Sequence, residues 1–193
     1  VYGEALAILA GDALLTAAFR VAADGARDAG VDPARALTLI ATIAVAAGAG
    51  GMVGGQVADL EAEGVVADRA VVESIHRRKT AALIAAAVDA GAVAGDAPGA
   101  RRAALAEYGR ALGLAFQIAD DILDATAPTA VTGKRVGGDA EHHKATYPAV
   151  LGLEGARAAA RELLARCLAA TDILGSPAEP LRAIATFVVE RAC

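Results

Sequence analysis

The sequence has few aromatic residues and few cysteines. Only 3% of its 193 residues are aromatic, none is tryptophan, and 56% are hydrophobic. A chain that builds its apolar content from alanine instead of aromatic residues favours closely packed helices, because alanine has the highest helix propensity. The two cysteines, Cys167 and Cys193, have neither zinc-type spacing nor a disulfide framework, which favours a reducing, cytoplasmic location. We expect an all-α fold.

An excess of positive charge is also lacking. The formal net charge is -5 and the pI is about 5.2. Proteins that bind nucleic acid concentrate positive charge, so we expect no nucleic-acid partner. No basic segment followed by a cleavage site opens the chain, and a secretory signal is therefore not predicted.

One stretch without charge, from Ala36 to Gly55, has the length of a membrane helix and contains glycines at GxxxG spacing. Its residues are mostly alanine and glycine, no aromatic belt flanks it, and Gln56 and Asp59 follow directly. We expect a buried helix of a bundle here and no membrane span.

Turn and capping signals divide the rest of the chain into helices. Asp32-Pro33 and Asp68 are typical helix starts, and glycines near 25–30, 91–95 and 133–138 are typical ends. No linker or repeat divides the chain, so one helical domain is expected. The predicted helices cover roughly 3–26, 32–51, 52 onward, 68–91, 98–125, 154–174 and 178–191.

The segment from Phe116 to Asp124 places three acids in an otherwise apolar helix. Asp120 and Asp124 lie one helical turn apart, Asp121 neighbours them, and Gln117 lies one turn earlier. Acidic side chains in a low-dielectric interior need a cation or a proton. Oxygen ligands with room for water suit Mg²⁺, which usually completes its coordination with substrate phosphates. A magnesium site and a phosphorylated substrate are predicted.

Two further polar stripes come from other helices. His76, Lys79 and Thr80 share one helix face, and Asp59 follows Gln56 on another. Lys79 is able to hold a phosphate, and Thr80 to contribute a hydroxyl contact or bend its helix. Taken alone, Lys79 is more often a surface residue. Asp12, in an apolar helix, is by itself more often a residue that caps or hydrogen-bonds locally.

Together these motifs resemble the trans-isoprenyl diphosphate synthases, also called the polyprenyl synthetase family. The sequence of residues 51–64 is most similar to that of farnesyl and geranylgeranyl diphosphate synthases, and the resemblance extends over essentially the whole chain. The motifs that carry it occur in family order: Gly11-Asp12-Ala13-Leu14-Leu15, Gly55-Gln56 with Asp59-Leu60, His76 with Lys79-Thr80, Phe116-Gln117 with Asp120-Asp121 and Asp124, Gly133-Lys134 with Gly137 and Asp139, and Lys144 with Thr146-Tyr147-Pro148.

The resemblance implies a helical bundle of the isoprenoid synthase type and a Mg²⁺-dependent short-chain prenyltransferase. Isopentenyl diphosphate would condense head to tail with an allylic diphosphate to give a farnesyl or geranylgeranyl product and release diphosphate. The implied partner is a second copy in a homodimer, with the 36–55 helix at part of the interface. The implied metal ligands are Asp120, Asp121 and Asp124. The implied substrate-binding residues are Asp59, Lys79, Thr80, Gln117, Lys134 and Lys144, of which Lys79, Thr80 and Gln117 would be catalytic.

The sequence departs from the family pattern in one respect. Members carry an earlier Asp-rich motif followed by basic residues that hold isopentenyl diphosphate, and the chain begins just downstream of that position with Val1-Tyr2-Gly3-Glu4. Residues 1–193 are thus interpreted as the C-terminal portion of one polyprenyl synthetase domain, truncated or incompletely represented, and we expect this fragment alone to be inactive. The sequence leaves open whether the product has 15 or 20 carbons.

Three alternatives belong to other classes. Terpene cyclases share the fold, but their later Asn/Ser/Glu metal motif is absent from the sequence. A di-iron bundle would need a second copy of the Glu-x-x-His pattern that Glu73 and His76 supply. A non-catalytic regulatory subunit of a heteromeric synthase is the main remaining alternative, although Asp120, Asp121, Lys79 and Lys144 are intact.

Overall fold

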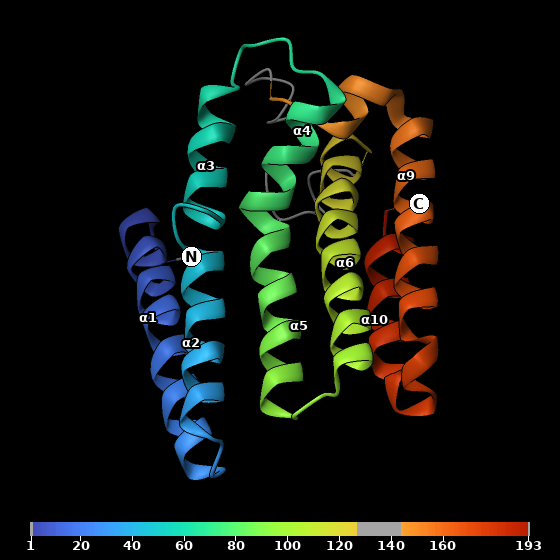
Figure 1. Ribbon diagram of the computed structural model, residues 1–193. Coiled ribbons are helices and arrows are strands. Elements are labelled where there is room, and N and C mark those ends of the chain that lie inside the picture. The colour runs from blue at the N-terminus through green and yellow to red at the C-terminus, as the bar shows by residue number, and fades with distance from the viewer. Residues whose placement is uncertain (1, 127–143, 193) are drawn as a thin grey trace.

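The computed structural model describes residues 2–126 and 144–192, and all regular structure within them is helical. The long helices run side by side in a bundle (Figure 1), which confirms the all-α prediction. The helices are α1 (Glu4–Asp28), α2 (Pro33–Ala47), α3 (Met52–Glu61), α4 (Arg69–His76), α5 (Ala82–Ala94), α6 (Gly99–Thr126), α9 (Tyr147–Thr171) and α10 (Glu179–Glu190), with a π-helical segment at Arg77–Ala81 and short 3₁₀ turns at Asp172–Leu174 and Ser176–Ala178.

Two of the helix starts form as the sequence predicts. The side chain of Asp32 accepts a hydrogen bond from the Arg35 amide at 3.1 Å, directly before Pro33. Asp68 accepts one from the Val71 amide at 2.9 Å. Each carboxylate satisfies an amide that the first turn of a helix leaves without an intrahelical acceptor.

Two helix boundaries differ from the prediction. The helix that begins at Pro33 ends at Ala47 and not near Gly51, because Gly48 takes an extended conformation with ψ -163°. The helix expected to begin near residue 154 is α9, and its first turn already begins at Tyr147. Gly152 separates this turn from the rest of α9 with φ +70°, a value that glycine adopts without steric cost. The turn matters because it places Tyr147 at the site described below.

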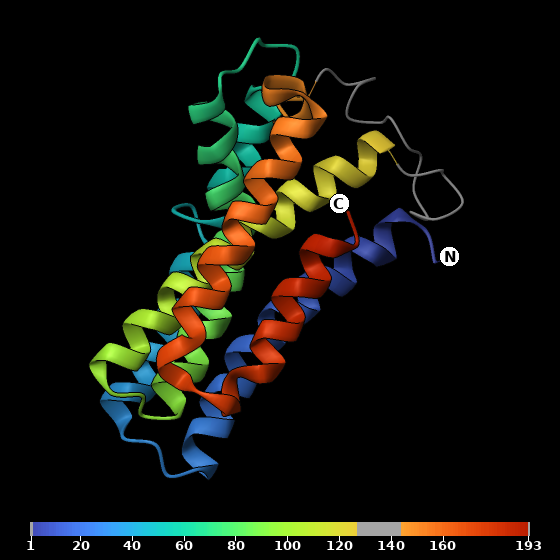
Figure 2. The same ribbon diagram turned by 90° about the vertical axis from the view of Figure 1, so that its right-hand side faces the viewer.

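The core lies where α6 packs against α9 and α10. Tyr108, Ile118 and Ile122 of α6 have no exposed surface, and Ala160 and Cys167 of α9 are buried against them. Burial of one isoleucine side chain contributes about 1.5–3 kcal/mol. This packing fixes α6, the helix that carries the acidic segment, as the central element of the bundle, between α5 and the pair α9 and α10 (Figure 1). Figure 2 shows α9 passing across α6.

Glycines allow α3 and α6 to approach the middle of the α4–α5 region very closely. A Cβ atom on Gly55 would lie 2.2 Å from the Lys79 amide nitrogen, and one on Gly113 would lie 2.5 Å from the Ala81 Cα. Real atoms do not approach to these distances, so both positions require glycine as long as the backbones stay where they are.

The sequence predicts one uninterrupted helix from Asp68 to the 91–95 glycines, but the structure has a π-helical segment at Arg77–Ala81 within it. Short π segments are rare and occur frequently at functional sites. This segment lies where the backbones of Gly55 and Gly113 approach Lys79 and Ala81. Tertiary packing therefore favours it, and no local sequence pattern predicts it. It carries Lys79 and Thr80.

The helix pair α1 and α2 forms one edge of the bundle (Figure 1). The expectation of a buried helix over residues 36–55 is only partly right. Leu39 is buried, whereas Leu37 and Val45 are 68% and 70% exposed. Within the described residues, two segments are apolar and long enough to cross a membrane, Glu4–Asp28 and Pro33–Glu61, but helices of soluble bundles meet the same criterion. The absence of a membrane span and the cytoplasmic location stay predictions.

Candidate active site

An ion pair joins α3 to the π-helical segment. The Lys79 ammonium donates to Asp59 Oδ2 at 2.5 Å, and the two side chains are 27% and 10% exposed. Asp59 is on the face of α3 where Gly55 lets the two backbones meet. The pair holds a positive charge at a fixed place while leaving part of the ammonium accessible to a ligand.

Hydrogen bonds continue from the next residue into α6. The Thr80 hydroxyl donates to Gln117 Oε1 at 2.6 Å. Gln117 Nε2 in turn donates to Asp121 Oδ1, one helical turn further on, at 3.2 Å. The sequence motifs of two helices 37 residues apart thus form one hydrogen-bonded row.

Asp121 lies at the buried end of this row. Its Oδ2 accepts the Tyr147 backbone amide at 2.9 Å and lies 3.5 Å from His76 Nε2. The side chains of Asp121 and His76 are each 4% exposed. A single carboxylate therefore contacts α6, α4 and the first residue of α9 at once.

These contacts bring together five of the residues predicted from sequence: Asp59, Lys79, Thr80, Gln117 and Asp121. Lys144, which is half-buried, precedes Tyr147 by three residues and so belongs to the segment that Asp121 anchors. Lys134, and with it the Gly133 to Asp139 motif, lies outside the described residues. Asp12 and Gln56 are exposed. The roles assigned to all of these residues stay predictions.

The other two acids of the segment, Asp120 and Asp124, are half-buried on α6 and one turn apart. Among the residues that the structure describes, no group of three or more His, Cys, Asp or Glu side chains is placed to hold a metal ion. Mg²⁺ seldom occupies an all-protein cage and is usually held by one or two carboxylates together with substrate phosphates. The donor set fits magnesium that arrives with a diphosphate.

Sequence reasoning missed the support behind this site. The Tyr147 hydroxyl donates to Glu73 Oε2 at 3.3 Å, and the Tyr147 ring stacks on His76 with centroids 5.5 Å apart. Burial raises the pKa of Glu73, but hydrogen bonding and charge from Arg77 outweigh it and hold that pKa below its ordinary value. Burial raises the pKa of Tyr147 to about 12. The Glu73-to-His76 spacing was noticed only as a fragment of a metal motif.

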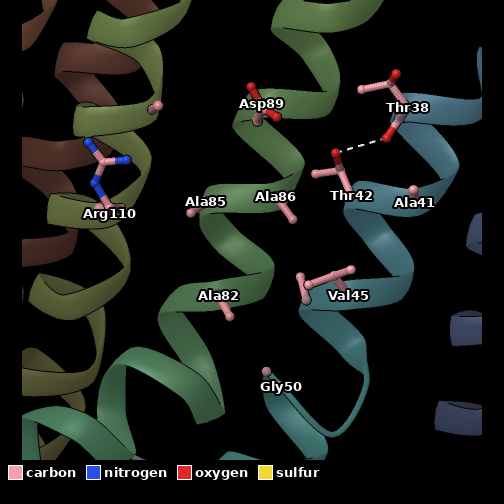
Figure 3. A pocket seen from close by; sticks show the side chains of 13 residues that line it. Thr38, Ala41, Thr42, Val45, Gly50, Ala82, Ala85, Ala86, Asp89 and Arg110 are labelled. Atoms are coloured by element: carbon pink, nitrogen blue, oxygen red, sulfur yellow. Dashed lines mark hydrogen bonds between the residues drawn. The ribbon is translucent and has the colours of Figure 1, made fainter. Parts of the chain in front are cut away.

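A cavity of about 650 Å³ lies between α2, α5 and α6. Gly50 and Ala82 lie toward one end, and Asp89 and Thr38 toward the other (Figure 3). Ala82 follows Thr80 by two residues, so the first end is near the polar site along the chain, although none of the residues Asp59, Lys79, Thr80, Gln117 and Asp121 lines the cavity itself. The lining between the ends consists mainly of small apolar side chains: Ala41, Val45, Ala46, Ala85, Ala86 and Ala106.

The sequence matches that of known proteins along most of its length. The pattern of the Polyprenyl synthetase family matches residues 1–174. The farnesyl diphosphate synthase of Escherichia coli is 44% identical over 194 aligned residues, which cover 98% of this chain and 64% of that protein. Geranylgeranyl pyrophosphate synthase 9 of Arabidopsis thaliana is 40% identical, with 99% of this chain and 54% of that protein covered.

Solved structures of similar proteins have the same fold as this chain. A geranyltransferase from Helicobacter pylori, complexed with magnesium and isoprenyl diphosphate, superposes with a TM-score of 0.79 at 29% identity over 98% of this chain and 61% of that chain. A geranyltransferase from Legionella pneumophila gives 0.80 at 25% identity, with 99% and 62% covered. The chain thus spans 54–64% of the length of these proteins. Both the sequence match and the fold lead to one conclusion: this chain belongs to the polyprenyl synthetase family.

Proposed function

We propose that the protein is a short-chain trans-prenyltransferase, which condenses isopentenyl diphosphate head to tail with an allylic diphosphate and releases diphosphate. The observation that carries this proposal is the polar row from Asp59 through Lys79, Thr80 and Gln117 to Asp121. An apolar cavity begins close to it along the chain, since Ala82, two residues after Thr80, is part of the cavity lining. The polar row suits a diphosphate and the cavity suits a hydrocarbon tail.

The residues of the polar row would act on different parts of the allylic substrate. Breaking its carbon–oxygen bond leaves negative charge on the diphosphate and positive charge on the allyl group. Lys79, held by Asp59, would bind the diphosphate oxygens, and Lys144 and Lys134 would add charge to the same group. The oxygens of Thr80 and Gln117 would face the allylic carbons with dipoles fixed in advance, which is the usual source of electrostatic stabilisation in enzymes.

The apolar lining of the cavity would limit the contact of the cation with water until the double bond of isopentenyl diphosphate attacks it. This alanine-rich lining offers no general base and little hydrogen-bonding capacity near Ala82 and Ala85. The proton that the condensation product must lose would go to the released diphosphate.

Asp120 and Asp124 are the residues proposed to hold Mg²⁺. Bound there, magnesium would neutralise the departing diphosphate and so make it a better leaving group. The half-exposed carboxylates suit this role, because a metal shared with a substrate needs ligands that the substrate can reach. Asp121 was predicted to be a third ligand, but both of its oxygens accept hydrogen bonds from the protein.

A homodimer is the proposed assembly. Large apolar side chains on α1 and α2 are more than half exposed: Leu6, Leu9, Leu14, Val21, Leu37 and Val45. Large apolar side chains left exposed on neighbouring helices are typical of a protein interface. These side chains extend the interface predicted for residues 36–55 to include α1.

The test of the proposed activity is an assay of the purified full-length protein with Mg²⁺, isopentenyl diphosphate and dimethylallyl, geranyl or farnesyl diphosphate. Released diphosphate together with longer prenyl diphosphates is the expected result, and the product lengths would decide between 15 and 20 carbons. Binding of these substrates without turnover would instead match the regulatory-subunit alternative.

The metal assignment has its own prediction. Asp120→Ala should lower turnover by about a hundredfold or more, the loss typical for one preorganised electrostatic group, with helix content unchanged. Glu162→Ala, an exposed acid on α9, is the matched control and should keep full turnover. Equal turnover in both variants would exclude Asp120 as a ligand.

A further inference from the structure

We propose that Asp121 is a positioning residue and does not bind the metal. It determines which end of the Gln117 amide faces Thr80 and in which direction the Thr80 hydroxyl donates its hydrogen bond. The inference rests on the proposed function, because it explains how the two side chains that would face the allylic substrate are oriented. Asp120 and Asp124 on the same helix remain the candidates for the metal.

The burial of Asp121 separates it from its neighbours. Its side chain is 4% exposed, whereas Asp120 and Asp124 are half-buried. Its two oxygens are held from different elements, Oδ1 by Gln117 Nε2 at 3.2 Å and Oδ2 by the Tyr147 amide at 2.9 Å. Each oxygen already accepts one of these hydrogen bonds, and because the side chain is only 4% exposed a hydrated metal ion would reach it only by opening the packing of Gln117 or Tyr147 around it.

An ionised carboxylate can only accept hydrogen bonds. The direction of the hydrogen bond at Asp121 therefore fixes the direction of the next one, between Gln117 and Thr80. Because Asp121 accepts, the Gln117 amide must turn its nitrogen toward Asp121 and its oxygen toward Thr80. The Thr80 hydroxyl then donates its single proton to Gln117 Oε1, at 2.6 Å. The remaining lone pairs of both oxygens are directed away from the row, where they are able to stabilise positive charge.

An asparagine at position 121 would reverse this order while keeping the size of the side chain. Its oxygen could still accept the Tyr147 amide, but its nitrogen would face the Gln117 nitrogen, and two donors cannot bond to each other. Gln117 would turn over, present its nitrogen to Thr80 and make the Thr80 hydroxyl an acceptor. The O–H bond of Thr80 would then point toward the substrate in place of a lone pair.

The hydrogen bonds from Asp121 through Gln117 to Thr80 are called the relay below. A double-mutant cycle between Asp121→Asn and Thr80→Val tests it. We expect Asp121→Asn to lower kcat by about 10–100-fold, as the loss of outer-shell partners commonly does. In the Thr80→Val background the same substitution should cost clearly less than in the wild-type protein, because only the Gln117 amide is left to reverse. Equal and multiplicative losses would mean that Asp121 acts through general structure, and would overturn the proposal.

The magnesium dependence of the same variants supplies a second readout. The Mg²⁺ concentration for half-maximal activity should stay at the wild-type value in Asp121→Asn and rise in Asp120→Ala. A rise in both would make Asp121 a ligand after all and would also overturn the proposal. Thr80→Ser, which keeps the hydroxyl, should preserve the relay and most of the kcat.

A neutron diffraction structure of the deuterated wild-type protein tests the orientation without any turnover. The deuterons of the Gln117 amide should lie on the atom that faces Asp121, and the Thr80 deuteron should point to Gln117. Deuterons on the atom facing Thr80 would refute the relay even if Asp121→Asn cannot be folded. Lack of prenyl transfer by the wild-type protein would count against the proposed function alone.

Discussion

At the scale of single residues, Asp89 and Arg102 form a two-point ion pair at the far end of the cavity. Arg102 Nε donates to Asp89 Oδ1 at 2.8 Å and Nη2 to Oδ2 at 3.0 Å. The hydrogen bond from Arg102 lowers the pKa of Asp89, against burial, which raises it. The pair links α5 to the start of α6 and gives the apolar cavity a polar end.

This pair predicts a pH-dependent contribution to stability. Because the folded-state pKa of Asp89 is lowered, its contribution is fully present above the unfolded-state pKa of about 3.9 and is lost as pH falls through the folded-state value. Asp89→Asn should lower the free energy of unfolding by about 0.5–1 kcal/mol at pH 7, and the difference should shrink below pH 4. Urea unfolding at pH 7 and pH 3 measures it, with the exposed Asp12→Asn as control.

At the scale of helices, the contact between α3 and the π-helical segment determines where Lys79 lies. Gly55 is the point of closest approach, since a Cβ there would meet the Lys79 amide nitrogen at 2.2 Å and its Cα at 2.5 Å. The ion pair of Lys79 with Asp59 spans the same contact. A shift of α3 would therefore move the charge that is proposed to hold the diphosphate.

Gly55→Ala should force the two helices apart. We expect a loss of about 1–3 kcal/mol in unfolding free energy, as in other overpacked cores, together with a lower kcat/KM because Lys79 moves. Gly91→Ala is the matched control: a Cβ there meets nothing within 4 Å, and alanine is the better helix former. A neutral Gly55→Ala would show that α3 does not approach as closely as the structure has it.

The cavity predicts how product length responds to side-chain size. Ala41 lines it from α2, whereas Ala44, which is exposed like Ala41, does not line it. Ala41→Phe should fill part of the space and shift products to shorter prenyl chains, and Ala44→Phe should leave the distribution unchanged. Chromatography of the dephosphorylated products measures the shift. Unaltered products from Ala41→Phe would place the hydrocarbon tail elsewhere.

At the scale of the whole molecule, the exposed apolar surface of α1 and α2 predicts self-association. Leu14, 74% exposed on α1, should lie within the interface. Leu14→Glu should shift the protein from dimer to monomer in light scattering after gel filtration. Val66→Glu, at a fully exposed loop position, should leave the dimer intact. A monomeric wild-type protein would contradict the proposed assembly.

Much of this architecture was predictable because its signals are local. Helix starts at Asp32-Pro33 and Asp68 depend on a carboxylate and the amides three residues later, a distance that the chain itself fixes. The candidate site was likewise predictable as a set, since the spacing of Asp120, Asp121 and Asp124 assigns them to one region of a single helix.

The remaining features depend on contacts between distant segments. The π-helical turn forms where Gly55 and Gly113 come within reach of it, and neither glycine is near it in sequence. The exposed side of α2 was not predictable either, because the charge-free stretch from Ala36 to Gly55 has the same pattern whether one side or all sides of the helix are covered.

The sequence alone determined that the chain is helical, where its helices begin and which side chains carry charge, since propensity, capping and periodicity act over a few residues. Only the tertiary structure decided how those side chains differ in burial and in hydrogen-bond partners. Three aspartates that look alike in sequence differ in burial because α4 and the start of α9 cover Asp121 and leave Asp120 and Asp124 accessible. Burial and hydrogen-bond partners are properties of packed helices, and no single helix contains them.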